Sequence, residues 1–436
     1  MAAFTIEARD GLTDARAGVL ATAHGDVRTP AFVPLATKAT VKGLLPAEVA
    51  ALGYEMVLGN TFHLLLNPGP ELIERFGGMG KFMGWDGPIV TDSGGFQVFS
   101  MGHGTVAEEI KSRPSRGRRS SPAHPRGEDG QGGAGEHRQA GEQVGAGMQA
   151  GQGERTGAIL AIEENGVRFR SYVDGRERFL SPEGSMATQA ALGSDLALVF
   201  DECTPFHVDR EYTQRSTERT HRWLERCLGW HAEHGPAEQL VYGIVQGGVY
   251  EDLRRESTQT IAASACEGIA IGGSLGAEKE QMYEVVGYAT RELGGEHERK
   301  PRHLLGIGEV DDLIRGVELG IDTFDCAMPT RLGRHGTALV PDPENRWRVD
   351  LKKSEWRESE EPLLEGCECP ACAEGLSRAY LSYLARAGEL TGARLLTMHN
   401  LAFLARLMRD LRAGILDGGL ENVARALRGG EFRPKR

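Results

Sequence analysis

The stretch VYGIVQGGVYEDLRRESTQTIAASACEGIAIGGS, residues 241–274, contains the repeating unit of the fold. Two short apolar runs, 241–247 and 268–274, end in glycine or polar residues, and they flank 249–266, where apolar residues recur at helical spacing. Apolar runs that alternate with amphipathic helices are typical of parallel strands covered by helices. The stretch therefore predicts one strand–helix–strand unit of an α/β fold.

The same alternation extends toward both ends of the chain. Short apolar runs of this kind occupy residues 31–37, 55–61, 88–94, 196–202, 241–247, 268–274, 303–309 and 322–328. Eight such units match a (β/α)8 TIM barrel, whose functional residues lie at the carboxyl ends of the strands. We predict this barrel, and a doubly wound open sheet is the alternative.

Two segments interrupt the alternation. Residues 112–155 contain 11 glycines, and their only large aliphatic side chains are Val144 and Met148. Burial cannot offset the entropy of ordering such a segment, so we predict a disordered insert. After it, 159–180 alternates apolar and polar residues around Asn-Gly and Asp-Gly pairs, which predicts a small antiparallel ribbon.

The composition argues against some classes of protein. The 436 residues include 50 Lys plus Arg and 62 Asp plus Glu, and the formal net charge of −12 argues against indiscriminate binding to nucleic acid. No run approaches the roughly 18 uninterrupted apolar residues of a membrane helix. The N-terminus carries acidic residues and no long apolar run, unlike a signal peptide. We expect a cytoplasmic protein that binds no membrane.

Three closely spaced cysteines, Cys367, Cys369 and Cys372, indicate a metal site. A structural zinc ion takes four ligands in a tetrahedron, and His399, in an apolar helical stretch downstream, is the candidate for the fourth. We predict one Zn²⁺ per chain, in a structural role because four protein ligands leave no open position. The alternative is a set of ordinary thiols and a core histidine.

These signals divide the chain into four parts. Residues 1–111 form the first part of the barrel, 112–155 the insert, and 156–340 the remainder of the barrel. From residue 341 the strand–helix alternation stops, and 341–436 are predicted to form a zinc-binding subdomain and C-terminal helices.

A carboxylate follows three of the predicted strands, at Asp92, Asp201 and Asp325. Carboxylates that converge on one pocket indicate a nucleophile and a general acid/base, as in retaining glycosyl transfer. Asp92 leads into a turn that lets backbone amides and an aromatic ring approach a planar ligand, formed by Ser93, Gly94, Gly95 and Phe96. For each aspartate, capping of the following helix is the alternative.

Two arginines, Arg331 and Arg334, follow Asp325 at a spacing that suits a phosphate group. A solvated loop is the alternative for this pair.

Five motifs together resemble the tRNA-guanine transglycosylases of the bacterial type. They are GNTFH (59–63), TDSGGFQ (91–97), FDECTP (200–205), GIVQG (243–247) and FDCAMPTR (324–331), and the cysteine cluster follows them. The likeness runs from about residue 4 to residue 428, apart from the insert. The resemblance implies a (β/α)8 barrel with a zinc-binding subdomain, present as a homodimer. The implied activity exchanges the wobble guanine, in the anticodon loop of GUN-anticodon tRNAs, for the deazaguanine base 7-aminomethyl-7-deazaguanine.

The resemblance also implies roles for individual residues. Asp325 would attack the ribose C1′ and form a covalent RNA–enzyme intermediate, and Asp92 would carry the proton of the departing and incoming bases. Asp201, Gln246 and the backbone of Gly273 would read the polar edge of the base. The turn Ser93, Gly94, Gly95 and Phe96 would contact the base, with Phe96 stacked on its face. RNA contacts are implied for Gly306, Ile307, Gly308, Glu309, Val310, Asp311 and Asp312, and for Thr330, Arg331, Leu332, Gly333 and Arg334.

Three features differ from the family pattern. The spacing from Cys372 to His399 is one residue longer than in the family, a difference that a loop can absorb. The insert leaves the barrel close to the predicted active site. The loop 272–278 reads GGSLGAE where bacterial members usually carry GGLAVGE, and a glycine at 276 widens the base pocket, as in enzymes that take the larger queuine base. A queuine-accepting enzyme is therefore an alternative. A non-catalytic RNA-binding subunit is another, although both Asp325 and Asp92 are present. An unrelated barrel glycosidase would leave the cysteine cluster unexplained.

Overall fold

The structure is a computed structural model that describes residues 3–96, 159–204 and 208–432. The predicted insert, 112–155, lies outside the described residues. Each of the eight predicted apolar runs overlaps one strand, and all the paired neighbours are parallel, in the order β4-β14-β13-β12-β11-β10-β6-β5. The strands are β4 (Ala31–Val33), β5 (Val57–Gly59), β6 (Ile89–Thr91), β10 (Leu196–Leu198), β11 (Leu240–Val245), β12 (Gly268–Ile271), β13 (Arg302–Leu304) and β14 (Thr323–Asp325).

The sheet closes on itself between its two end strands. Leu35, just after β4, forms a parallel bridge with Leu58 in β5. The backbone N–H of Leu58 donates to the carbonyl of Pro34 at 3.0 Å, and that of Ala36 donates to the carbonyl of Leu58 at 2.7 Å. An open sheet would leave these edges unpaired. The predicted barrel is therefore confirmed, and the open-sheet alternative is wrong.

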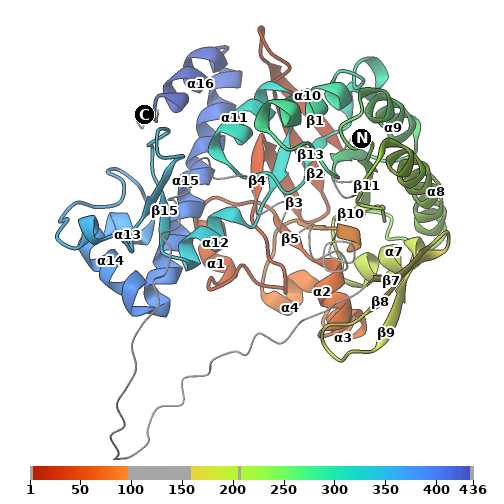
Figure 1. Cartoon of the computed structure of the whole chain (residues 1–436), viewed down its shortest axis with the longest axis horizontal. Helices are drawn as coiled ribbons and strands as arrows, with labels where there is room; N and C mark the ends of the chain where they lie inside the picture. The colour runs from red at the N-terminus through yellow and green to blue at the C-terminus, as the bar shows by residue number, and fades with distance from the viewer. Residues whose placement is uncertain (1–2, 97–158, 205–207, 433–436) are drawn as a thin grey trace, which may run out of the picture.

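Helices lie around the outside of the strands (Figure 1). They are α1 (Pro46–Ala51), α2 (Thr61–Leu66), α3 (Pro70–Arg75), α4 (Met79–Met83), α7 (Pro182–Ala191), α8 (Arg210–His234), α9 (Glu251–Ala263), α10 (Lys279–Thr290), η1 (Gly295–Arg299), α11 (Val310–Glu318) and α12 (Met328–Arg334). Strand side chains are buried because helices cover the outer face and the barrel interior is filled. Trp223 of α8 shows this outer layer, since its ring stacks on Phe200 at 5.0 Å between centroids.

Two three-stranded antiparallel sheets accompany the barrel in the part of the chain that the structure describes. The predicted ribbon is confirmed as β7 (Ile159–Glu163), β8 (Gly166–Arg170) and β9 (Glu177–Leu180). A further sheet, not predicted from the sequence, consists of β1 (Phe4–Arg9), β2 (Arg16–Thr22) and β3 (Gly25–Thr29). It is joined to the barrel by a buried ion pair, Arg16 Nη2 to Asp322 Oδ2 at 2.5 Å, just before β14.

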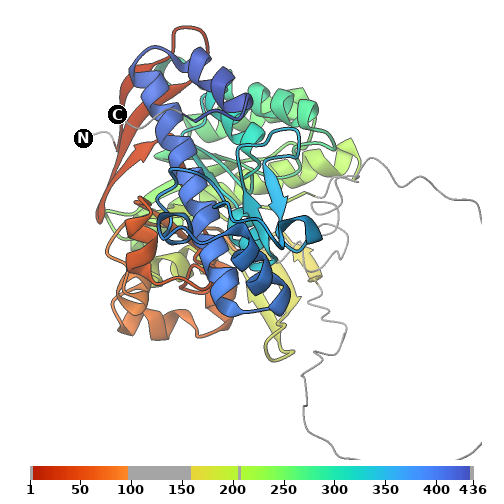
Figure 2. The ribbon, with the colours of Figure 1, turned by 90° about the vertical axis from the view of Figure 1, so that its left-hand side faces the viewer.

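The C-terminal segment packs along the barrel. Its elements are β15 (Thr337–Leu339), β16 (Arg348–Asp350), η2 (Ser354–Trp356), α13 (Pro370–Ala373), α14 (Arg378–Ala387), α15 (Leu390–Leu416) and α16 (Leu420–Arg428). The long helix α15 contacts α12, β1, β2 and β4, and Figure 2 shows it in blue beside the red N-terminal strands. α15 therefore occupies the place of a barrel helix after β14 while it also carries His399.

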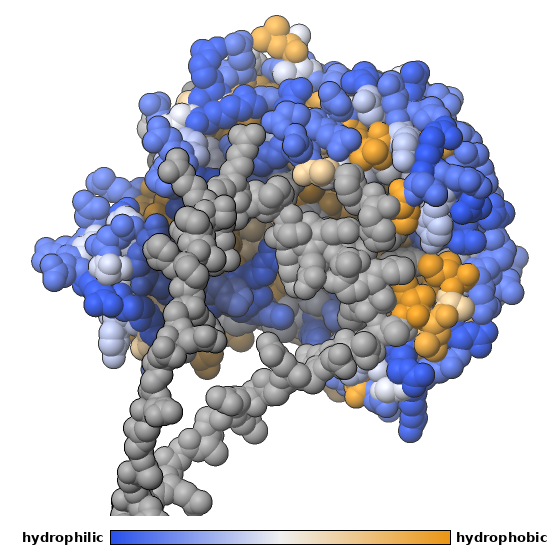
Figure 3. All heavy atoms as spheres, in the orientation of Figure 1, coloured by the Kyte–Doolittle hydropathy of each residue, from blue (hydrophilic) through white to orange (hydrophobic). Residues whose placement is uncertain are grey.

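The described surface is mostly hydrophilic on the face shown in Figure 3. Exposed apolar side chains occur on the ribbon and its turns, at Leu160, Val173 and Phe179. Among the helices described, none is long and apolar enough to cross a membrane.

Candidate active site and metal site

Asp325 ends strand β14 at the carboxyl end of the barrel, with only 7% of the residue exposed. Its Oδ1 accepts a hydrogen bond from the backbone N–H of Gly306 at 3.1 Å and lies 3.0 Å from Nε2 of His303. The other ring nitrogen of His303 lies 2.8 Å from Oγ1 of Thr323. The carboxylate is thus held through one of its two oxygens.

Asp92 follows strand β6 and is held by the motif 59–63. Its Oδ1 accepts from the backbone N–H of Thr61 at 2.9 Å, and its Oδ2 accepts from the side-chain amide of Asn60. The Thr61 hydroxyl also donates to the backbone carbonyl of Asp92 at 2.5 Å. Asn60 has a second role, because its Oδ1 caps helix α2 by accepting from the backbone N–H of His63. The motif therefore orients the second carboxylate.

A buried polar cluster joins the ends of β6, β10 and β11. Oδ1 of Asp201 accepts from the Ser93 hydroxyl at 2.9 Å, and Oδ2 accepts from Nε2 of Gln246 at 2.6 Å. Asp201 is 5% exposed, and burial raises its pKa to about 6 although both hydrogen bonds act in the opposite direction. A carboxyl group of this kind can be charged or neutral near physiological pH. It is suited to read hydrogen-bond donors on a ligand.

Gln246 is fully buried, and its Oε1 has no hydrogen-bond partner among the residues described. Gly273, with φ of +76°, approaches this oxygen so closely that an added Cβ would lie 2.1 Å from it. On the other side of the cluster, a Cβ on Gly95 would lie 2.8 Å from the carbonyl of Asp201. The cluster therefore combines a carboxylate, an unpaired amide oxygen and backbone that only glycine permits, which suits the edge of a planar polar ligand.

A buried arginine that the sequence analysis missed supports the same loops. The guanidinium of Arg254 donates to the carbonyls of Val245 at 3.1 Å, Gly248 at 2.7 Å, Gly272 at 2.8 Å and Ser274 at 2.9 Å. Burial lowers its pKa to about 9. By tying the end of β11 to the loop after β12, Arg254 fixes Gln246 relative to Gly273.

Four cations lie on the segments that follow β4 and β14: Lys38, Lys42, Arg331 and Arg334. None of them has a carboxylate within ion-pair distance among the residues described. Burial first, then the charges of Arg334 and Lys38, lower the pKa of Lys42, which shows that the two segments adjoin. Nη1 of Arg334 is buried without a hydrogen-bond partner among the described residues. This cation group, of which only the arginines were predicted, leaves positive charge available to a ligand.

An aromatic pair adjoins the cation group. Nζ of Lys38 lies 5.8 Å from the ring centroid of Tyr172, whose hydroxyl lies 2.7 Å from Nδ1 of His63. Burial, followed by the charges of Lys38 and Lys42, lowers the pKa of His63 to about 4. His63 is therefore neutral near pH 7, and the positive charge at this place comes from the lysines.

The loop 306–312 lies between β13 and α11, and its side chains are largely engaged within the protein. Glu309 pairs with Arg348, Asp311 accepts from Nε1 of Trp347 at 3.0 Å, and Oδ1 of Asp312 accepts from the Tyr283 hydroxyl at 2.7 Å. Val310 is buried, Ile307 is half-buried against the core, and a Cβ on Gly308 would lie 2.6 Å from Cβ of Cys326. Within this loop, the backbone N–H of Gly306 donates to Oδ1 of Asp325. RNA contact by the loop stays a prediction.

The segment 330–334 belongs to helix α12, which packs on α15. Thr330 and Gly333 are buried, and a Cβ on Gly333 would lie 2.5 Å from the backbone nitrogen of Thr397. Arg331 is exposed, and Leu332 and Arg334 are half-buried. Of the remaining predicted residues, Gly94 has φ of +78° and Phe96 is 40% exposed at the last described position before the gap.

The four predicted metal ligands meet in one cluster, with all ligand atoms within 4.8 Å of one another. Nδ1 of His399 lies 3.8 Å from Sγ of Cys367 and 3.4 Å from Sγ of both Cys369 and Cys372. Ligands about 2.3 and 2.0 Å from a tetrahedral zinc lie about 3.5 Å apart, so this donor set fits the ion. Nε2 of His399 lies 2.8 Å from the carbonyl of Leu339, the usual orienting contact of a metal-bound histidine.

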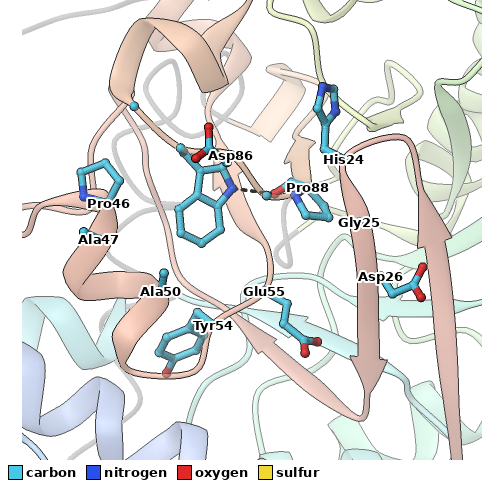
Figure 4. A pocket seen from close by; sticks show the side chains of 13 residues that line it. His24, Gly25, Asp26, Pro46, Ala47, Ala50, Tyr54, Glu55, Asp86 and Pro88 are labelled. Atoms are coloured by element: carbon cyan, nitrogen blue, oxygen red, sulfur yellow. Dashed lines mark hydrogen bonds between the residues drawn. The ribbon is translucent and has the colours of Figure 1, made fainter.

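A cavity of about 370 Å³ lies elsewhere in the molecule (Figure 4). Its lining comes from the turn between β2 and β3, from α1 and from the segments before β5 and β6. The dashed line in Figure 4 is the hydrogen bond from Nε1 of Trp85 to the carbonyl of Pro88, at 3.1 Å. These segments adjoin the amino ends of the strands, opposite the predicted active site, and the cavity contains none of the predicted residues.

Comparison with known proteins gives one family. The family model described as "Queuine tRNA-ribosyltransferase" matches residues 10–120 and 148–429, and the unmatched residues between them fall within 112–155. A protein named queuine tRNA-ribosyltransferase from Roseiflexus sp. (strain RS-1) is 46% identical over 425 residues, 95% of this chain and 96% of that protein. Proteins of the same name from Pelotomaculum thermopropionicum and Thermus thermophilus are each 42% identical, over 95% and 97% of this chain and 95% and 92% of their own lengths.

Proposed function

The chain belongs to the queuine tRNA-ribosyltransferase family, and on this premise we propose that it is a tRNA-guanine transglycosylase of the bacterial type. It exchanges the wobble guanine of GUN-anticodon tRNAs for 7-aminomethyl-7-deazaguanine. The observation that carries the proposal is the pair of anchored carboxylates, Asp325 and Asp92, which follow strands of the same parallel barrel and so lie at the same end of it.

The reaction proceeds by two displacements at the ribose C1′. Asp325 forms a bond to C1′ while the glycosidic bond to guanine breaks, and the bonding pair leaves with the base, which takes a proton from Asp92. The incoming base then attacks C1′, returns its proton to Asp92, and the carboxylate of Asp325 leaves. The energy of the broken glycosidic bond is kept in the new bond between C1′ and Asp325, so no nucleotide triphosphate is needed. Two inversions retain the β configuration.

The buried polar cluster reads the base in this proposal. Guanine presents N–H donors beside a carbonyl acceptor, and the acceptors Asp201 and Gln246 suit those donors because Oε1 of Gln246 is unpaired among the described residues. Ser93 and Arg254 hold the cluster in place. Phe96 stacks on the face of the base, as the resemblance implies.

The cation group binds RNA phosphates on either side of the target nucleotide. A chain with a net charge of −12 needs such a local basic surface, and Lys38, Lys42, Arg331 and Arg334 supply it without carboxylate partners among the described residues. A wobble base lies in a single-stranded loop, so it can be turned into the pocket at modest cost.

A queuine-accepting enzyme is the second candidate, favoured by one feature. Gly276 has φ of +110°, and a Cβ there would lie 2.6 Å from Oε1 of Gln281. The same Oε1 accepts from the backbone N–H of Ala277 at 3.1 Å. The loop thus has no side chain at 276, and its conformation disfavours one, which leaves room for a larger substituent on the deazaguanine.

Zinc is the metal we propose for the Cys3His cluster. Bound there, it would act structurally, because it would join the cysteine segment 367–372 to His399 of α15. The next residue, Asn400, connects α15 to the segments around α12 and β15, because it donates to the carbonyl of Pro329 at 3.0 Å and accepts from the backbone N–H of Leu339 at 2.7 Å. Metal binding therefore supports α12, the helix that carries Arg331 and Arg334.

A cytoplasmic homodimer is the assembly that we propose, on the resemblance. Exposed apolar side chains available for a partner include Tyr380, Tyr383 and Leu390, at 44%, 60% and 84%. Sedimentation of wild type and of a Tyr383→Glu variant measures this directly, and a monomeric wild type contradicts it.

The proposed function is tested by base exchange. Purified protein is incubated with radiolabelled guanine and a tRNA with a GUN anticodon, and label retained in the RNA is counted. We expect incorporation by wild type, none by Asp325→Asn, and unchanged incorporation by Asp26→Asn at the far cavity. A tRNA whose wobble guanine is replaced by adenine is the substrate control. Absence of incorporation by the folded wild-type protein would contradict the proposal.

A further inference from the structure

His303 is a buried histidine that contacts the predicted nucleophile. It lies in strand β13, pairs in register with Thr323 of β14, and is 2% exposed. Thr323 and Asp325 are two residues apart on one strand, so their side chains share a face of the barrel. The imidazole spans both of them, with Nδ1 2.8 Å from Oγ1 of Thr323 and Nε2 3.0 Å from Oδ1 of Asp325.

The chemistry of these groups decides which atom donates. An ionised carboxylate only accepts hydrogen bonds, so Nε2 of His303 carries the hydrogen and donates to Oδ1 of Asp325. In the neutral ring Nδ1 is then an acceptor, and it receives the hydroxyl hydrogen of Thr323. Thr323 therefore selects the tautomer in which His303 faces Asp325 as a donor.

The two oxygens of Asp325 are consequently unequal. Oδ1 has two donors, His303 and the backbone N–H of Gly306 at 3.1 Å. Oδ2 has no hydrogen-bond partner in the ranges 3–96, 159–204 and 208–432. An oxygen with two donors is a poorer nucleophile than its free neighbour, so the contacts direct one atom of the carboxylate at the substrate.

We propose that His303 is a positioning residue for the nucleophile and that Oδ2 of Asp325 is the atom that bonds to C1′. The inference rests on the proposed function. In the first step a lone pair of Oδ2 forms the bond to C1′, and the pair of the C1′–base bond leaves with guanine, which takes the proton of Asp92. In the second step the incoming base supplies the pair, its proton goes to Asp92, and the pair of the C1′–Oδ2 bond returns to the carboxylate. His303 keeps its proton and stabilises the negative charge that returns to Asp325.

The test separates a donor from a merely space-filling ring. His303→Gln keeps an N–H donor close to the place of Nε2, whereas His303→Phe keeps a planar ring without a donor. Thr323→Ser keeps the hydroxyl, and Thr323→Val replaces it with a methyl group of similar volume. His231→Gln, at a half-buried histidine of helix α8, is the control. The readouts are the single-turnover rate of covalent RNA adduct formation and, separately, the Kd for tRNA.

We expect His303→Phe to slow adduct formation by about 10- to 100-fold, because the carboxylate of Asp325 loses its fixed orientation toward C1′, with the Kd for tRNA within about twofold of wild type. His303→Gln should recover to within about tenfold of wild type, and Thr323→Val should slow the reaction more than Thr323→Ser. Thermal unfolding checks that each variant is folded. If His303→Phe does not fold, His303→Gln and the Thr323 pair still decide the question.

Two results overturn the inference. One is a folded His303→Phe variant, or failing that a folded Thr323→Val variant, that forms adduct at the wild-type rate. The other is a folded His303→Gln variant no faster than His303→Phe or than Asp325→Asn. Failure of the proposed function looks different, because wild type and His231→Gln would then form no adduct at all.

Discussion

Replacement of Gly273 by alanine tests the base-reading cluster most sharply. Two separate effects follow from the structure. The φ of +76° costs an alanine about 1–2 kcal/mol, because the left-handed region crowds its Cβ against the backbone. In addition, the new Cβ would lie 2.1 Å from Oε1 of Gln246, which is too close for two non-bonded heavy atoms, so the amide must leave its place beside Asp201.

The second effect falls on the reaction with the base. Displacing Gln246 breaks its 2.6 Å hydrogen bond to Oδ2 of Asp201, and hydrogen bonds to charged groups contribute about 1.5–3 kcal/mol. Since about 1.4 kcal/mol is a factor of ten, Gly273→Ala should lower kcat/KM for guanine about 10- to 100-fold.

Gly175 supplies the matched control. It lies in the turn between β8 and β9 with φ of +72°, and an added Cβ would meet nothing within 4 Å. Gly175→Ala therefore has the same backbone cost without the clash. Urea unfolding should show the backbone cost alone for Gly175→Ala and a larger loss of stability for Gly273→Ala, which also displaces a buried amide, while guanine exchange should fall only for Gly273→Ala.

The double variant Gly273→Ala/Gln246→Ala completes the cycle. With the amide gone, the glycine substitution should cost little further activity. The reasoning is refuted if Gly273→Ala exchanges guanine as Gly175→Ala does, or if its effect is undiminished in the Gln246→Ala background.

Three further predictions concern the carboxylate, the metal and the RNA surface. The pKa of Asp201 in the folded protein, about 6, lies above its ordinary value near 4. The free energy of unfolding of wild type, relative to that of Asp201→Asn, should therefore fall by up to about 3 kcal/mol as pH rises from 4 to 7, as measured by urea unfolding. A difference between the two proteins that does not change with pH contradicts this. Guanine, which needs the ionised carboxylate, should correspondingly show a rising KM as pH falls from 7 to 5. Elemental analysis should find one zinc per chain. Cys369→Ser should lose the zinc and bind tRNA more weakly, whereas Cys266→Ser should retain it. If metal loss leaves tRNA binding unchanged, the metal does not support the RNA-binding position of α12. Lys38→Gln and Arg331→Gln should each reduce the slope of log association constant for tRNA against log salt concentration by about 1. Arg255→Gln, on helix α9, should leave the slope unchanged. Equal slopes for all three variants argue against the cation group as the RNA surface.

Much of the fold was predictable because its signals are local. Each barrel strand is a short apolar run closed by glycine or polar residues, and the hairpin turns of the ribbon are marked by Asn-Gly and Asp-Gly pairs. Closure of the barrel is a non-local fact, decided by the pairing of Leu35 with Leu58, and no periodicity reports it. The N-terminal sheet was missed because no helix separates its three strands, so it lies outside the strand–helix alternation, and because its place depends on packing against α15.

The candidate site was likewise predictable where its signals are local and not where they depend on distant contacts. Cysteine spacing indicated three candidate metal ligands, and the structure adds that His399 is buried among them. Two contributors went unnoticed: His303 opens an apolar run, and Arg254 is one of many polar residues in the amphipathic stretch 249–266. A histidine at the start of an apolar run shows no partner in sequence, and its contact with Asp325 depends on the register of two strands. The acidic side chains of 306–312 bind partners that are distant in the sequence, such as Trp347 and Tyr283, so the sequence alone could not show that they are engaged within the protein.

The most direct measurement is the identification of the residue that carries the RNA. Wild-type protein is mixed with a GUN-anticodon tRNA and denatured, the covalent complex is digested with nuclease and protease, and the ribosylated peptide is sequenced by mass spectrometry. We predict a single ribose ester on Asp325, absent from Asp325→Asn and released when excess guanine is added before denaturation. A ribosylated peptide that lacks Asp325, or base exchange without any covalent complex, would contradict the account.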